Sequence, residues 1–158
     1  MLNDRGLDLS YTDICKAELI GAIGNQQSEL EDAYTQKWED AEEQIGREGF
    51  KDLFSHIRTI VLKARLKDTI LKELRNSVFP KYKSRPTAFI DEVLLPYKNA
   101  YDVIKTFSYQ NDHLSGEVNG ILRWLRWIDN SDWLPVAMLA YQQYSYDSAK
   151  FLSILKHL

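Results

Sequence analysis

The sequence predicts an all-α protein, an irregular bundle of about eight helices. Hydrophobic residues recur at three- and four-residue steps through nearly the whole chain, which is the spacing that lines one face of a helix. Ser or Asp precedes several of these runs, and Gly or Pro interrupts them, as expected at helix boundaries. No segment alternates like a strand, and no repeat or linker marks a second domain. We therefore expect residues 1–158 to form a single helical domain.

The first helix is predicted from a capping pattern. Ser10, followed three residues later by Asp13, resembles a capping box with Asp in place of Glu. The helix should cover residues 11–23, and the pair Gly24-Asn25 should break it.

Gly46 separates the next two expected helices. Ser28 can cap the earlier one and Gly46 can end it. Its apolar face would consist of Leu30, Ala33, Tyr34, Trp38, Ala41 and Ile45. The later helix has the most regular hydrophobic spacing in the chain, formed by Phe50, Leu53, Phe54, Ile57, Ile60, Val61 and Ala64.

Prolines delimit the middle of the chain. A fourth helix should stop at Pro80, and its apolar residues are Leu66, Ile70, Leu71, Leu74 and Val78. The fifth and longest helix should start at Pro86. Proline fits the first turn of a helix because the backbone N–H groups there have no partner within the helix, so the missing N–H of proline costs nothing. Its apolar residues are Phe89, Ile90, Val93, Leu94, Tyr97, Tyr101 and Ile104. Pro96 falls within this run and predicts a kink or a break.

Three shorter helices are expected after residue 114. Ser115 should open the first, whose apolar residues are Ile121, Leu122, Trp124, Leu125 and Ile128. Asp132 should cap the second, with Pro135 in its first turn and with Leu134, Ala137, Met138 and Tyr141 facing inward. Asp147 should cap the last, which carries Phe151, Leu152, Leu155 and Leu158.

The composition excludes several classes of protein. Hydrophobic residues make up 44% and charged residues 27%, an ordinary balance for a globular domain, and the net charge of −3 gives no overall attraction to DNA or anionic lipid. A single cysteine, Cys15, excludes an internal disulfide and a multi-cysteine zinc site. No apolar run approaches the ~18 residues of a membrane span, and no signal peptide is evident. We expect a cytoplasmic protein without a membrane partner.

The charges are distributed unevenly along the chain. Residues 25–48 hold eight acids against two bases, a net of −6, whereas residues 58–85 hold nine bases against two acids, a net of +7. One interpretation is a nucleic-acid-binding face, whose candidate residues are Lys63, Arg65, Lys67, Lys72 and Arg75. The other, which the acidic whole molecule favours, is a pair of solvated helix faces that partly neutralise one another.

The segment Arg123-Trp124-Leu125-Arg126-Trp127 combines two tryptophans with two arginines. Such residues can stack on unpaired bases and bind phosphates. Helical spacing favours a structural role instead, because Trp124 is expected to share a face with Ile121, Leu125 and Ile128. We therefore expect Trp124 in the core and Trp127 half exposed.

We find no catalytic or metal-binding motif. His56, His113 and His157 are scattered, and neither a His-Glu-x-x-His nor a phosphate-binding glycine loop is present. His56 precedes the core residue Ile57 and should lie at the flank of the buried face. Cys15 lies near a helix N-terminus, which would lower a thiol pKa, but without a nearby histidine it should serve packing.

The opening of the chain resembles a family signature. The segment 2–16 is similar to a stretch of the GmrSD-type restriction endonuclease N-terminal-domain family, with the pattern Asn-x-x-Gly-x-x-Leu-Ser-x-x-Asp-Ile/Leu-x-Lys. The matching residues are Asn3, Gly6, Leu9, Ser10, Asp13, Ile14 and Lys16. The similarity continues more weakly at Trp38, at Phe50 to Ile57, around Tyr97 and Tyr101, and at Trp133-Leu134-Pro135.

The resemblance implies that this chain is the helical scaffold of a larger phage-defence protein that restricts modified DNA. The ParB-like Asp-Gly-Gln-Gln-Arg part, which handles the nucleotide, would precede Met1, and an HNH nuclease would follow Leu158. The full-length protein would then use an NTP and a divalent metal, whereas this segment would be non-catalytic and bind no cofactor. Asn3, Arg5 and Gly6 could touch a phosphate there, although a plain helix-capping turn explains them as well.

Two function classes remain open from the sequence. In the first, the chain is the accessory helical part of a restriction nuclease, and both ends look like cuts within a longer protein. In the second, it is a stand-alone helical module that binds a protein or DNA through an apolar face or the basic stretch.

Overall fold

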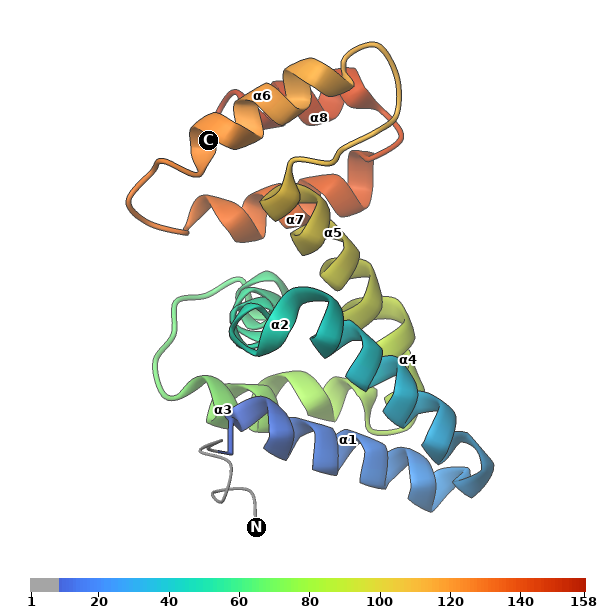
Figure 1. The fold of residues 1–158 in the computed structure, drawn as a ribbon. Coiled ribbons are helices and arrows are strands. Elements are labelled where there is room, and N and C mark those ends of the chain that lie inside the picture. The colour runs from blue at the N-terminus through green and yellow to red at the C-terminus, as the bar shows by residue number, and fades with distance from the viewer. Residues whose placement is uncertain (1–8) are drawn as a thin grey trace. The chain divides into compact units, whose positions relative to one another are not determined.

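The computed structural model describes residues 9–158 and confirms the all-α fold. These residues form an irregular set of helices, turns and loops, with no strand among them. None of the described helices is both long and apolar enough to cross a membrane. The chain packs as two compact units, one up to Leu94 and one from Leu95 to Leu158, and each is described by itself (Figure 1).

Helix α1 (Tyr11–Gln26) begins the first unit and contacts α2 (Glu31–Leu62) (Figure 1). The predicted capping box is present: the Ser10 hydroxyl accepts from the Thr12 N–H, and the Ser10 N–H donates to Asp13 at 2.9 Å. The predicted break at Gly24 is wrong, because α1 continues through it. A Cβ at this position would lie 2.8 Å from the Glu31 carboxyl carbon, so the missing side chain makes room for Glu31.

Gly46 interrupts α2 as the sequence predicts. Its φ of 81° and ψ of 162° are non-helical, and a new helical segment follows it directly. Ser28 does not cap the earlier segment, because residues 28–30 form a 3₁₀ turn and Leu30 occupies the cap position. The local break depends on a backbone conformation that residues with a side chain rarely adopt.

Gly46→Ala should therefore lower the free energy of unfolding by about 1–3 kcal/mol, the usual cost of a strained backbone position. Open space surrounds the added methyl group, so strain alone would cause the loss. Gly21→Ala is the matched control, since Gly21 lies inside α1 with open space around it and should gain up to about 1 kcal/mol. Urea denaturation of both variants measures the difference, and equal effects would contradict the strained backbone.

After α2 the chain forms short helical pieces: α3 (Ile70–Glu73), a π-helical segment (Leu74–Val78) and a 3₁₀ turn (Phe79–Tyr82). The predicted fourth helix is thus shorter and irregular, and Leu66 lies outside it, 48% exposed. Pro80 does not end the helical run, because the 3₁₀ turn places it in a first turn where no N–H is needed.

The first unit closes with α4 (Pro86–Ala88), which begins at Pro86 as predicted, and with a π-helical segment (Phe89–Leu94). Regular α-helix resumes at Leu95, so the π turn stands directly before Pro96. Proline has no N–H to donate to the preceding turn, and a wider turn accommodates that loss. The irregularity expected from Pro96 is therefore this π segment.

An aromatic cluster forms the core of the first unit. Trp38 is 1% exposed, and its ring centroid lies 5.5 Å from that of Phe50 and 5.3 Å from that of Phe54. Phe50 and Phe54 are 5.1 Å apart, and Phe89 lies 6.1 Å from Phe54. The cluster joins the two segments of α2, on either side of Gly46, to the π turn.

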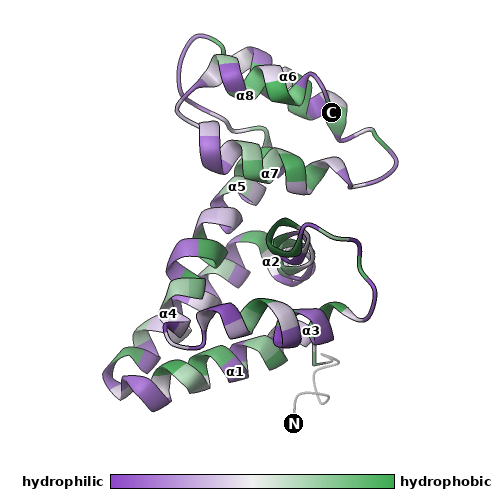
Figure 2. Ribbon diagram, turned by 180° about the vertical axis from the view of Figure 1, so that it is seen from behind, coloured by the Kyte–Doolittle hydropathy of each residue, from purple (hydrophilic) through white to green (hydrophobic). Residues whose placement is uncertain are grey.

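The second unit contains α5 (Leu95–Thr106), α6 (Ser115–Leu125), α7 (Trp133–Tyr144) and α8 (Ser148–Leu155). Helix α7 contacts α5 and α8, and α6 contacts α8. Hydrophobic and hydrophilic residues alternate along the helices of both units (Figure 2). This amphipathic pattern agrees with the spacing of apolar residues in the sequence.

Tyr109 anchors the loop between α5 and α6. It is 2% exposed, and its hydroxyl donates to the Ser145 carbonyl at 2.7 Å. The Asn119 side chain holds the loop backbone, accepting from the Tyr109 N–H at 2.9 Å and donating to its carbonyl at 3.0 Å. Asp147 caps α8 as predicted by accepting from the Lys150 N–H, whereas Asp132 makes no side-chain cap to α7.

Candidate nucleic-acid interface

The structure divides the predicted basic face into paired and unpaired residues. Arg75 pairs with Glu18 at 2.7 Å, and Lys72 lies 3.8 Å from Asp68. Lys63, Arg65 and Lys67 are exposed, and among residues 9–158 they have no ion-pair partner. These three lie on one segment, residues 63–69, which we call the 63–69 loop.

Two buried or half-buried charges hold the 63–69 loop in place. The Glu73 carboxylate accepts from the Lys67 N–H at 2.8 Å and from the Asp68 N–H at 2.9 Å. Arg58, whose side chain is 4% exposed, donates to Glu73 at 2.5 Å and to the Ala64 carbonyl at 2.7 Å. The loop backbone is thus tied to α2 and α3 while its cations remain in solvent.

Lys63 places the start of the loop at the end of α2. It adopts the left-handed conformation, with a φ of 52° and a ψ of 37°, and its N–H donates to the Thr59 carbonyl. A lysine in this conformation is uncommon, since glycine usually occupies such a position. The arrangement puts a cation beside the negative end of the helix dipole, where cations are favoured.

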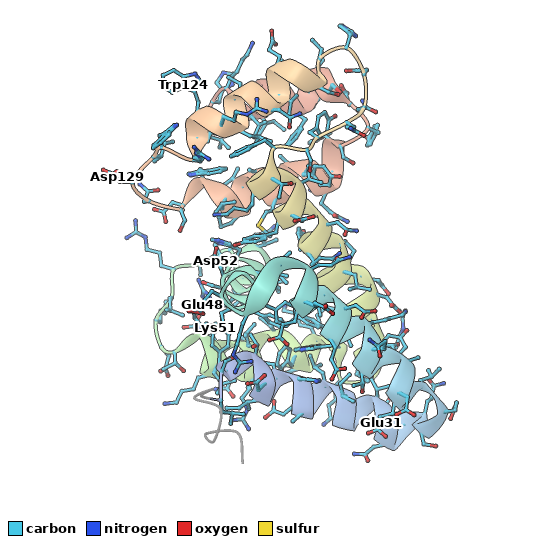
Figure 3. All side chains as sticks on the ribbon, in the orientation of Figure 1. Glu31, Glu48, Lys51, Asp52, Trp124 and Asp129 are labelled. Carbon is cyan, nitrogen blue, oxygen red and sulfur yellow. The ribbon has the colours of Figure 1, made fainter. Side chains whose placement is uncertain are left out.

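The acids of residues 25–48 pair mainly with bases outside the basic block. Glu39 pairs with Lys16 at 2.7 Å, and Glu42 lies 3.4 Å from Arg47. Glu48 pairs with Lys51 on the same helix (Figure 3). These contacts leave the cations of the 63–69 loop available to an anionic partner.

A second cationic surface lies on α6 and differs from the sequence prediction. Trp124 is 76% exposed and Trp127 is 71% exposed, so the expected core position of Trp124 is wrong. Figure 3 shows the Trp124 side chain projecting away from the α6 ribbon. The buried face of α6 consists instead of Val118, Leu122 and Leu125.

The arginines beside these tryptophans stack on aromatic rings. The Arg123 and Arg126 guanidinium carbons each lie 5.5 Å from the Phe107 ring centroid, and that of Arg126 also lies 4.8 Å from the Trp127 ring. Phe107 has a positive φ of 55°, which is unusual for a bulky residue. We call Phe107, Arg123, Trp124, Arg126 and Trp127 the arginine–tryptophan surface.

The described residues contain no group of three or more His, Cys, Asp or Glu side chains placed to hold a metal. Cys15 is fully buried, and burial raises the pKa of its thiol to about 12, so the lowering expected from the helix N-terminus does not occur. His56 is 5% exposed and lies 3.4 Å from Asp52, so its expected flank position is wrong.

The nucleotide-binding candidates Asn3, Arg5 and Gly6 lie outside the described residues. Comparison with protein-family models, with curated proteins and with solved structures finds no match for this chain.

Proposed function

We propose that this chain is the helical, non-catalytic part of a GmrSD-like protein that restricts modified DNA, and that the 63–69 loop contacts the DNA backbone. The similarity of segment 2–16 to that family supports the first half of the proposal. The exposed, unpaired cations of the loop support the second half.

The observation that carries the DNA contact is the anchoring of the loop. A phosphate contact is weakened when a flexible side chain or loop must become ordered on binding. Arg58 and Glu73 already order the backbone between Ala64 and Asp68, so binding need only restrict the side chains of Lys63, Arg65 and Lys67. Cations at such positions bind phosphates without reading base sequence.

Arg65→Glu/Lys67→Glu should weaken binding to a labelled DNA duplex and reduce the salt dependence of that binding. Each lost phosphate contact lowers the slope of log K against log salt by about 1, so the double variant should lose about 2. Fluorescence anisotropy over a salt series measures both quantities. Lys81→Glu/Lys83→Glu is the matched control, because it changes the charge equally at exposed positions of the same unit outside the loop.

Equal losses in the two variants would mean that only net charge matters and would overturn the loop contact. The family half of the proposal is tested separately by reading the gene on both sides of this segment. An upstream Asp-Gly-Gln-Gln-Arg motif supports the restriction protein. Its absence, together with loop-dependent duplex binding, would favour a stand-alone DNA-binding module.

A further inference from the structure

We infer that the arginine–tryptophan surface binds the unpaired bases and phosphates of a single-stranded nucleic acid. This surface belongs to the second unit, and the inference does not depend on the 63–69 loop or on the restriction family. The 63–69 loop is proposed to contact duplex DNA, whereas this surface would bind a single strand at a different site.

The two tryptophans supply exposed stacking faces. Trp124 and Trp127 stand three residues apart at the end of α6 and flank a hollow of about 280 Å³ whose remaining lining residues are Gly120 and Arg123. Open space surrounds the position where Gly120 would carry a Cβ, so no side chain fills the hollow. Stacking on an indole tolerates any base, because every base has an aromatic face.

The two arginines supply oriented cations. The Arg126 guanidinium carbon lies within cation–π distance of both Phe107 and Trp127, and a guanidinium carries five N–H donors that match a phosphate. The Arg123 guanidinium carbon lies at the same distance, 5.5 Å, from the Phe107 ring centroid. Neither arginine pairs with a carboxylate within the described residues, whereas Arg58 and Arg75 do.

The backbone of Phe107 supports this arrangement. Phe107 has a φ of 55°, a conformation that is strained for a bulky residue and persists only where the surroundings enforce it. Here it places one ring against both guanidinium groups, which gives the arginines a common support. Strained residues of this kind cluster at binding sites.

A larger hollow next to Arg126 could receive a base. Its volume is about 580 Å³, and Phe107, Arg126 and Trp133 line it together with the polar residues Lys105, Asp129, Asn130, Ser131 and Asp132. Asp129 lies in the loop that follows α6 (Figure 3). Carboxylate and amide oxygens accept hydrogen bonds from the N–H groups on the Watson–Crick edge of an unpaired base, such as the N3–H of thymine. The hollow thus combines ring faces, cations and acceptors, which together match a nucleotide.

Other partners fit these observations less well. A duplex hides its base faces, so it could not use the exposed indoles. A proline-rich peptide would pack on the indoles but would leave the stacked, unpaired arginines without anionic partners. The combination of stacking faces and oriented cations therefore favours a single strand.

The test measures binding of a labelled oligothymidylate of about 15 nucleotides, a length sufficient for several stacked bases. Trp124→Ala/Trp127→Ala should weaken binding at least tenfold, whereas Trp124→Phe/Trp127→Phe should retain most of it. Oligonucleotide should also quench the tryptophan fluorescence of the unaltered chain. Tyr146→Ala is the matched control, because Tyr146 is 75% exposed in the same unit and should not affect binding.

Three results would overturn the inference. Unchanged affinity of the Trp→Ala variant would exclude stacking on these indoles. Equal affinity for duplex and single strand would indicate backbone attraction alone. Binding of a proline-rich peptide without binding of oligothymidylate would assign the surface to a protein partner. Arg65→Glu/Lys67→Glu should leave oligothymidylate quenching unchanged, which separates this site from the 63–69 loop.

Discussion

Phe54→Ala should lower the free energy of unfolding by about 4 kcal/mol, the loss typical of removing a buried phenylalanine ring. Phe54 is fully buried, and its ring lies within 6.1 Å, centroid to centroid, of the rings of Trp38, Phe50 and Phe89. Removing it takes away the central member of this cluster and leaves a cavity that the rigid helix segments cannot fill. The cost combines lost hydrophobic burial with lost contacts around the cavity.

Urea denaturation followed by circular dichroism measures this loss. Near-ultraviolet signals should change as well, because the buried indole of Trp38 packs directly on Phe54. Phe54→Leu retains most of the volume and should cost clearly less. Val136→Ala, at a position 47% exposed in the second unit, should be nearly neutral. A Phe54→Ala variant as stable as the unaltered chain would contradict the central role of this ring.

Arg58→Met should lower the free energy of unfolding by about 1.5–3 kcal/mol, the range for losing hydrogen bonds made by a charged group. The variant loses the bonds to Glu73 and to the Ala64 carbonyl, although Glu73 keeps two backbone donors. The 63–69 loop should also lose order, and hydrogen exchange of its backbone amides should become faster. Duplex binding should become weaker, because the loop would no longer be anchored and would have to become ordered on binding.

The same pair predicts a dependence of stability on pH. Hydrogen bonds from the Lys67 and Asp68 N–H groups and from Arg58 hold the pKa of Glu73 below its ordinary value of 4.5. A lowered folded-state pKa gives stability that is present above pH 4.5 and is lost as the pH falls through the folded value. In the Glu73→Gln variant, the free energy of unfolding should therefore fall less steeply than in the unaltered chain as the pH drops below 4.5.

The exposed pair Lys72–Asp68 provides the control for both experiments. The atoms are 3.8 Å apart and both side chains are more than half exposed, so Lys72→Met should change stability by less than about 1 kcal/mol. An Arg58→Met variant as mild as Lys72→Met would show that the loop is not held by the Arg58–Glu73 pair.

Local signals in the sequence predicted those parts of the structure that depend only on residues close together in the chain. The Ser10–Asp13 capping box, the Asp147 cap and the start of α4 at Pro86 each involve groups within three or four residues. The interruption of α2 at Gly46 is also local, because it depends on the backbone conformation of that one residue. Such features need no knowledge of what packs against them.

The sequence could not decide which face of a helix is buried when two faces are apolar. In α6 the residues Ile121 and Trp124 share one face, which the sequence pattern extends to Ile128, and Val118, Leu122 and Leu125 share another. Contact with α8 buries the second face and leaves Trp124 and Ile128 in solvent. The candidate binding surface therefore could not be recognised from spacing alone.

The sequence by itself determined the helical class, several helix ends and the positions of the cations, because these follow from periodicity and local hydrogen bonding. Only the tertiary structure separated paired from unpaired charges, since Arg58 of α2 meets Glu73 of α3 and Arg75 meets Glu18 of α1. It also exposed Trp124 and buried His56. Burial and charge pairing are set by which helix surfaces meet, and the burial of apolar area across each whole unit is the main driving force for that choice.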